Sequence, residues 1–222
     1  AGLELLGTGP YTLTNAGNNV ATIAGSVTNA VQYTDTDDLT VGSVTTVGLA
    51  ASGVVLSAGD TLTLSQNVNT GAGDVRLVST ADVTQDGGAI TANNLGVRAV
   101  TGVTLAQPGN NAVTVAILNT TSGNVSYQDT SGFALGTVGT LGAFTSTSGI
   151  EATGLQNVRL NSGGAVTQGV GANITAAGLE LLGTGPYTLT NAGNSVTTLA
   201  ADTTGAISYR DTSALVVGVV GG

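Results

Sequence analysis

The densest negative charge of the chain lies in one short run, Asp35-Thr36-Asp37-Asp38. Three carboxylates this close can supply the oxygen ligands that Ca²⁺ prefers, so Asp35, Asp37 and Asp38 are candidate Ca²⁺ ligands. Two carboxylates across a cleft can also hydrolyse a glycosidic bond. A third interpretation is a solvated turn, in which Asp side chains bond to the nearby backbone. The related runs later in the chain keep one carboxylate each, and this favours the turn over a metal or catalytic site.

Arg76 and Arg159 form a second candidate set, because each stands in a Val-Arg-Leu run. A guanidinium can bind a carboxylate through two parallel hydrogen bonds, so these outward arginines are candidate contacts for an acidic glycan. Surface arginines more commonly stay solvated or pair with a nearby Asp. The sequence favours this second interpretation and leaves the first one open.

Several kinds of chemistry are excluded by residues that the chain lacks. It has no His and no Cys, which excludes His-based triads, His metal ligands and thiol nucleophiles. The net charge of −9 argues against a nucleic-acid partner, because phosphate binding needs dense positive charge. No run of about 18 apolar residues occurs, as a membrane-spanning helix would need. We therefore expect no catalytic residue, no cofactor, no resident metal, no nucleic-acid partner and no membrane span.

The elements that must position these residues are short strands. In Tyr11-Thr12-Leu13-Thr14, the apolar residues face one side and the threonines the other, and this period of two recurs along the chain. Turn residues, as in Asn15-Ala16-Gly17-Asn18-Asn19, separate the runs at a spacing of about ten residues. Because 41 % of the residues are apolar, an ordered core is expected rather than disorder. The sequence therefore predicts an all-β fold.

One string of eighteen residues occurs twice without change, at residues 1–18 and 177–194. A more divergent copy begins near residue 93, where Leu95 and Leu105 match Leu3 and Leu13. Each copy is followed by a Tyr-x-Asp-Thr run. We therefore expect residues 1–222 to form one continuous array built of the blocks 1–92, 93–176 and 177–222, of which the last is partial.

Repetition favours a parallel β-solenoid over an antiparallel sandwich, because like positions in stacked coils lie above one another and tolerate only mild changes. A coil of ~20 residues gives about eleven coils, with Asn18 and Asn19 expected in Asn ladders at a corner. The first block has about eleven residues more than the second between Val47 and Gly73. We expect this extra half coil to form either a loop-out or a longer coil around residues 65–73. The predicted inward residues of the three blocks are Leu13, Ile23, Tyr33 and Leu39; Leu105, Val115, Tyr127 and Phe133; and Leu189, Leu199, Tyr209 and Leu215.

Three runs resemble the repeats of filamentous-haemagglutinin-type exoproteins, which Gram-negative bacteria secrete by the two-partner route: GLELLGTGPYTLTNAGN, VSYQDTSGFALGTV and GAVTQGVGANITAAGLELLG. The resemblance covers essentially the whole chain. It implies a right-handed parallel β-helix, export through an outer-membrane partner barrel, and a role as an adhesin or surface filament. No receptor-binding motif of the family transfers to these residues.

Together these observations predict a structural rod segment of a secreted bacterial adhesin or extracellular surface filament, without catalysis. Its expected partners are other copies of itself, through coil ends or lateral faces, and a cell-surface glycan or protein receptor. The alternative is a β-helical protein that binds or degrades polysaccharide, with Asp35, Asp37 and Asp38 near its cleft.

Overall fold

The computed structural model describes residues 1–221, and this part of the chain consists of β-strands and turns without any helix. The strands are β1 (Gly2–Gly7), β2 (Tyr11–Leu13), β3 (Thr22–Val27), β4 (Val31–Thr34), β5 (Leu39–Val41), β6 (Leu49–Ala50), β7 (Val54–Ala58), β8 (Leu62–Leu64), β9 (Val68–Asn69), β10 (Asp74–Ser79), β11 (Asp82–Gln85), β12 (Ile90–Ala99), β13 (Gly102–Leu105), β14 (Asn111–Asn119), β15 (Val125–Asp129), β16 (Phe133–Leu135), β17 (Thr137–Val138), β18 (Thr147–Ser148), β19 (Ile150–Ala152), β20 (Asn157–Ser162), β21 (Val166–Gln168), β22 (Ile174–Gly183), β23 (Tyr187–Leu189), β24 (Ser195–Thr203), β25 (Ile207–Tyr209) and β26 (Val216–Val217). Among the described residues, no helix is present that could cross a membrane.

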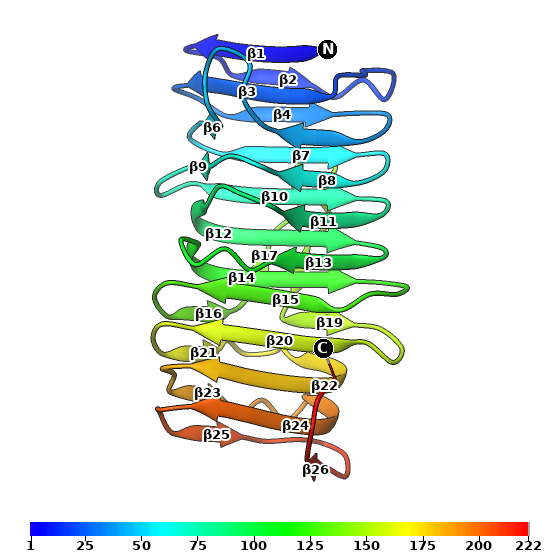
Figure 1. Ribbon diagram of the computed structural model, residues 1–222, viewed down its shortest axis with the longest axis vertical. Helices are drawn as coiled ribbons and strands as arrows, with labels where there is room; N and C mark the ends of the chain where they lie inside the picture. The colour runs from blue at the N-terminus through cyan, green and yellow to red at the C-terminus, as the bar shows by residue number, and fades with distance from the viewer. Residues whose placement is uncertain (222) are drawn as a thin grey trace.

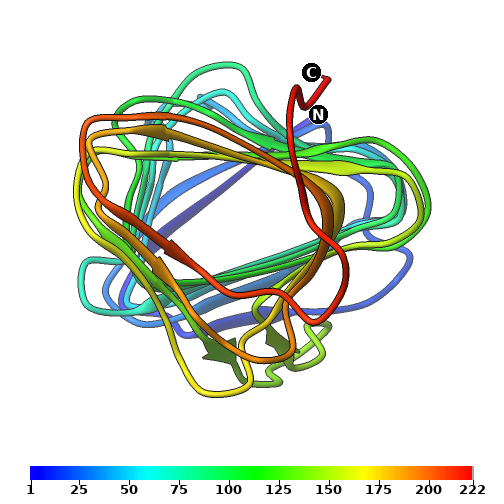
Figure 2. The same cartoon turned by 90° about the horizontal axis from the view of Figure 1, so that it is seen from below.

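Successive coils pair as parallel strands and build one continuous solenoid (Figure 1). Along one side the pairings run β2–β4–β7–β10–β12–β14, which we call the first ladder. Along another side they run β1–β3–β5–β8–β11–β13–β15–β20–β22–β24–β26, the second ladder. About eleven coils of ~20 residues stack in this way, so the predicted solenoid and its coil length are confirmed. Viewed along the axis, the coils superpose as a closed loop around one interior (Figure 2).

The interior is filled by the apolar residues that alternate along each strand. The inward residues predicted for the middle block, Leu105, Val115, Tyr127 and Phe133, are all buried. In the outer blocks, the predicted inward residues are either buried or pack half-buried against the same core. Because each buried aliphatic side chain contributes about 1.5–3 kcal/mol, this column of stacked side chains supplies much of the stabilisation. The predicted core is therefore confirmed.

The length of one sequence block does not equal a whole number of coils. Leu3 lies on the second ladder, where it pairs with Ile23. Its sequence equivalent Leu95 lies on the first ladder, where it pairs with Val75 and Val115. A block thus comprises several whole coils and part of another, and equivalent residues of neighbouring blocks face different sides of the rod.

The structure has neither the loop-out nor the longer coil expected around residues 65–73. Val68, in the middle of this segment, pairs with Leu49 on one side and with Ile90 on the other, as a regular coil does. Four pairing steps separate Tyr11 from Leu95, whereas the equivalent part of the second block, from Val103 to Leu179, has three. The first block therefore holds one whole coil more. The difference in length between the blocks is only about half a coil because residues 136–149 of the second block lie outside the coil and partly offset the missing coil.

Two segments leave the coil and lie on its outer surface, and we call them straps. The first strap is residues 42–48 and the second is residues 136–149. In both, the last Gly N–H donates to the carbonyl oxygen of the first Gly, at 2.9 Å for Gly48 to Gly42 and 2.8 Å for Gly149 to Gly136. The second strap contains the antiparallel pair β17–β18, which projects beyond the outline of the coils at the bottom of Figure 2.

The second strap is held by a small apolar cluster on the outer face of the first ladder. Phe144 and Val138 are buried there against Val55 and Ala116. Gly96 makes room for the ring, because a Cβ atom at this position would lie 2.5 Å from Phe144 Cζ. The strap is therefore packed on the rod rather than loosely attached.

Replacing Phe144 with Ala should detach the second strap, because truncation of a buried Phe to Ala costs about 3–5 kcal/mol of stability. Hydrogen exchange at the Leu141 and Phe144 amides, which bond to each other's carbonyls, should become fast while the ladder amides stay protected. The matched control is Leu141→Ala, which truncates a side chain that is 42 % exposed on the same strap. Unchanged exchange in Phe144→Ala would contradict this account of the strap.

Candidate functional site

A hydrogen-bonded Tyr–Asp clasp recurs in each block, formed by the Tyr-x-Asp-Thr run. In the middle block, the Tyr127 hydroxyl donates to Asp129 Oδ2 at 2.6 Å. The same oxygen accepts from the Ala112 N–H at 2.9 Å, and Oδ1 accepts from the Ser131 N–H at 2.9 Å. Both carboxylate oxygens are thus engaged in holding a corner closed, and the Asp129 residue is only 2 % exposed.

The other two clasps have the same geometry. Asp35 Oδ2 accepts from the Tyr33 hydroxyl at 2.8 Å and from the Val20 N–H at 2.9 Å. Asp211 Oδ2 accepts from the Tyr209 hydroxyl at 2.7 Å and from the Val196 N–H at 2.9 Å. The threefold recurrence indicates that the Asp of this motif serves the structure of the corner.

The clasps of Asp35 and Asp211 lower the pKa of the carboxyl group, and all three clasps raise the pKa of the Tyr hydroxyl. Burial acts to raise the pKa of Asp35, but the hydrogen bonds from Val20, Tyr33 and Asp37 outweigh it and hold that pKa below its usual value. Burial also opposes a lowered pKa at Asp211, where hydrogen bonds from Ser213, Tyr209 and Val196 again prevail. Burial and the neighbouring carboxylate raise the pKa of each clasp Tyr above its usual value.

The three candidate Ca²⁺ ligands do not share a centre. Asp35 serves the clasp, Asp37 Oδ2 accepts from Asn19 Nδ2 at 2.8 Å, and Asp38 Oδ1 accepts from the Thr61 N–H at 3.0 Å. Within residues 1–221, no group of three acidic side chains is placed to hold a metal ion. The geometry matches the turn interpretation of the acidic run.

The predicted Asn ladder at Asn18 and Asn19 is wrong, since Asn18 Nδ2 donates to the carbonyls of Leu13 and Thr34. In the two later blocks, the Asn equivalent to Asn18 pairs with a Gln side chain instead of with another Asn. Asn110 exchanges two hydrogen bonds with Gln85 of the preceding coil, at 2.8 and 3.0 Å. Asn194 does the same with Gln168. Mixed Gln–Asn amide pairs, rather than stacked Asn side chains, therefore tie these corners.

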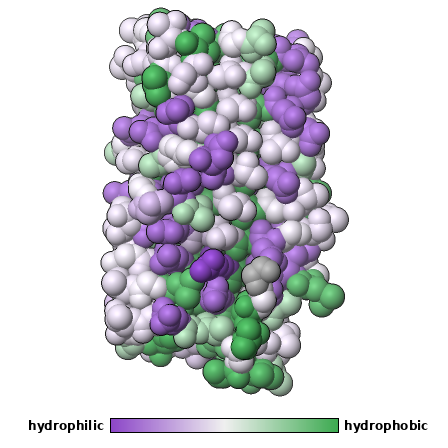
Figure 3. Space-filling view, in the orientation of Figure 1, coloured by the Kyte–Doolittle hydropathy of each residue, from purple (hydrophilic) through white to green (hydrophobic). Residues whose placement is uncertain are grey.

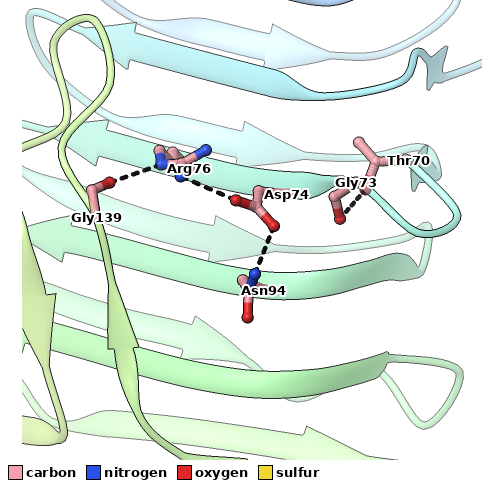
Figure 4. A network of polar contacts seen from close by, with 6 residues as sticks. All are labelled: Thr70, Gly73, Asp74, Arg76, Asn94 and Gly139. Atoms are coloured by element: carbon pink, nitrogen blue, oxygen red, sulfur yellow. Dashed lines mark hydrogen bonds and ion pairs between the residues drawn. The ribbon is translucent and has the colours of Figure 1, made fainter.

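Arg76 lies beneath the second strap (Figure 4). Its Nε donates to the Gly139 carbonyl at 2.9 Å, and its Nη2 pairs with Asp74 at 2.9 Å. Asn94 donates to the other oxygen of Asp74 at 2.6 Å. The Arg76 side chain is only 11 % exposed, so its donors serve the strap rather than an open surface.

Arg159 has the opposite setting. Its side chain is 58 % exposed, and Nε pairs with Glu180 Oε2 at 3.0 Å. The two residues line a groove of about 150 Å³ together with Asn124, Val125, Ser126, Asn157, Val220 and Gly221. On the face that carries β20 and β22, polar and apolar residues are interspersed, and apolar ones gather at its lower end (Figure 3). Arg159 therefore lies in an open groove, whereas Arg76 is covered by the second strap.

The structure does not bring Arg76 and Arg159 together. Arg76 stands on the first ladder opposite Val55 and Gly96, and Arg159 stands on the second, opposite Ser126 and Glu180. A single ligand cannot use both as one face. Sequence reasoning missed the strap contacts of Arg76, although the Gly-rich run 136–149 between two matched strands was the signal that could have indicated them.

A column of hydroxyl groups follows the outer face of the second ladder. Thr40, Thr63, Thr84, Thr104 and Ser126 pair in register on successive coils. Thr63 and Thr84 are linked through their hydroxyls at 3.2 Å. The sequence repeat did not reveal this column, because its members come from non-equivalent positions of the blocks.

No protein-family model, no curated protein and no solved structure matches this chain. The geometry of its own residues is therefore what supports a function.

Replacing Asp129 with Asn should destabilise the protein by about 1.5–3 kcal/mol, because hydrogen bonds to a buried charged group are worth that much. An amide offers one acceptor oxygen where the carboxylate offers two, and its NH₂ group faces other donors. The free energy of unfolding from urea titration measures the effect. Asp202→Asn, at an exposed carboxylate, is the control, and equal stability of the two variants would contradict the structural role of the clasp.

Stability should fall at both ends of the pH scale. The lowered pKa values of Asp35 and Asp211 contribute stability that is present above about pH 4 and is lost as the pH falls through the folded-state pKa. The raised pKa values of Tyr33, Tyr127 and Tyr209 contribute stability that is present below about pH 10 and is lost as the pH rises further. Urea titrations across the pH range measure the free energy of unfolding at each pH and test both effects. In Tyr127→Phe, the free energy of unfolding should fall less steeply at alkaline pH, and an unchanged slope would count against this assignment.

Proposed function

We propose that the chain is a structural rod segment of a secreted bacterial adhesin or extracellular surface filament, and that it works without catalysis. The observation that carries this proposal is the use of the recurring polar residues. The Tyr–Asp clasps and the Gln–Asn pairs recur from block to block, and each holds a corner of the coil. Residues used in this way serve the continuity and stiffness of the stack rather than a reaction.

The wider setting follows from the resemblance of the repeats to two-partner-secreted exoproteins. We propose on this basis that the protein acts outside the cell or on its surface, after export through an outer-membrane barrel as its secretion partner. The solenoid is compatible with that proposal, since parallel coils can extend without a change of design. A cell-surface glycan or protein is the proposed receptor class.

A second candidate function is a β-helical protein that binds or degrades polysaccharide. The hydroxyl column of the second ladder and the open Arg159 groove favour binding over degradation, because both offer hydrogen-bonding groups to a sugar. The carboxylates of the acidic run, in contrast, are spread over separate hydrogen bonds. We therefore rank glycan binding by the rod above hydrolysis.

Self-association through the coil edge is part of the proposal. In the described structure, β1 pairs with β3 alone, whereas the identical residues within β22 pair with β20 and with β24. Leu3 is half-buried, whereas its identical counterpart Leu179 is fully buried. An unpaired strand edge is a template for another strand, so the polypeptide 1–222 presents an edge that a second copy can cover.

The polypeptide 1–222 should behave as an elongated β-rod that associates end to end as its concentration rises. Sedimentation velocity and small-angle scattering measure both properties. Leu3→Lys puts a charge on the coil edge and should suppress the association, whereas Leu6→Lys alters a side chain that is 52 % exposed on the outer side of the same strand. A globular monomer at all concentrations, or turnover of pectins or acidic glycans with or without Ca²⁺, would refute the proposal.

A further inference from the structure

The second strap runs along the axis of the rod, across the strands of the first ladder. It lies on one outward column of residues that pair in register on successive coils, and we call this column the strap seat: Gln32, Val55, Arg76, Gly96 and Ala116. The Phe144 ring lies over the Gly96 end, and a Cβ atom on Gly142 would lie 2.5 Å from Gln32 Oε1. The strap thus crosses five coils, which span about 19 Å at about 4.8 Å per coil.

Two arginines bind polar atoms of the strap. Arg76 Nε donates to the Gly139 carbonyl at 2.9 Å (Figure 4), and Arg98 Nη1 donates to Thr147 Oγ1 at 3.1 Å. The chain has four Arg, no Lys and a net charge of −9, so half of its cationic side chains are gathered at this one place. The strap itself carries no charged residue. The seat is therefore complementary to the strap through its donors as well as through the apolar cluster around Phe144.

The coil is closed behind the strap. The Gly149 N–H donates to the Gly136 carbonyl at 2.8 Å, so the two ends of the strap meet where the chain leaves and re-enters the coil. Between these ends, β17 and β18 pair with each other alone, and Leu141 and Phe144 exchange two backbone hydrogen bonds near the tip. The strap is thus a hairpin of its own, held to the ladder by side chains. Lifting it off the seat would leave the strand pairing of the coils in place.

We propose that the second strap is an exchangeable arm, and that the strap seat of one copy binds the second strap of another copy. Exchange replaces each contact within a copy by the identical contact between copies, so its main cost is the entropy of association. Strap and seat lie on the same face of the rod, and the exchange is therefore reciprocal and joins two rods side by side. This inference does not depend on the proposed function, because it rests on contacts within one copy.

The arm is long enough for this exchange. Residues 137–148 give about six residues on each side of the hairpin, which reach about 20 Å when extended. Two packed β-faces lie only about 10 Å apart. Phe144 stands next to the turn of the hairpin, so the anchor is carried far from the rod when the strap swings out. Glycines at both ends, Gly136 and Gly149, can absorb the change of direction, and Gly149 already has a φ of 68°.

The test uses two full-length variants, each of which lacks one half of the contact. Gly96→Val blocks the seat, because a Cβ atom at this position would lie 2.5 Å from Phe144 Cζ, and it leaves the strap free with its anchor intact. Phe144→Ala removes the anchor and leaves the seat open. Mixed together, the two variants should form a 1:1 complex in which the strap of the blocked variant occupies the seat of the open one.

Hydrogen exchange shows whether the seat is occupied. In isotope-labelled Gly96→Val alone, the Leu141 and Phe144 amides should exchange fast. As unlabelled Phe144→Ala is added up to millimolar concentration, these amides should regain protection by about tenfold, because the hairpin is ordered again on the partner. Adding Arg76→Ala to the open variant removes the donor to the strap carbonyl and should weaken binding by about tenfold. Adding Arg210→Ala, at an exposed arginine elsewhere on the rod, should leave it unchanged.

The control partner is the double variant Gly96→Val/Phe144→Ala, which has no open seat but keeps the same coil ends. It should restore no protection, and this separates strap exchange from end-to-end association. Exchange that stays fast at every concentration of the open variant, or protection restored equally by the double variant, would overturn the proposal. Protected ladder amides in every variant show that the rod itself remains folded.

Discussion

The whole molecule depends on hydrogen bonds between the backbones of neighbouring coils. Apart from the end strands β1, β2, β25 and β26 and the strap pair β17–β18, each strand is bonded to the coil before it and to the coil after it. This pairing fixes the position of each side chain along the rod axis. In the interior it stacks apolar side chains on apolar side chains, so that Leu, Val and Ile form continuous columns. Corners are the weak points of such a stack, because backbone polar groups there lose their regular partners.

The corners are accordingly where the buried polar residues gather. Asp129 holds a turn through four donors, from Tyr127, Ala112 and both donor groups of Ser131. Asn110 and Gln85 close another corner by bonding to each other. A buried polar group is costly when unpaired and stabilising when fully paired, so these residues specify where the chain turns. The straps add a second kind of fastening, since they tie the outer surfaces of several coils together.

Much of the fold could be predicted from the sequence, because alternation and repetition are local signals. Period two gave the strands, and the recurrence of Leu13, Ile23 and Tyr33 gave the stacked core. Pairing register between coils is not a local signal, and for this reason the position of Leu95 on a different side from Leu3 was hidden. The excursion at residues 136–149 was hidden too, since nothing in its residues says whether a Gly-rich run belongs inside or outside the coil.

The candidate site could be predicted less well than the fold. Arg76 and Arg159 were singled out by identical neighbours, yet one is covered by a strap and the other is open. The difference comes from residues that are distant in sequence, such as Gly139, and from the side of the rod on which each arginine falls. The sequence favoured a turn at the acidic run but left a Ca²⁺ site open, because Asn19 and Thr61, the partners of Asp37 and Asp38, are distant in sequence.

The fractional ratio of block to coil has a consequence for multivalency. The first strap lies over the second ladder and the second strap lies over the first, so the two straps project from different sides of the rod. A flat surface that meets one strap therefore does not meet the other, and contacts made through the straps are divided between two sides of the rod.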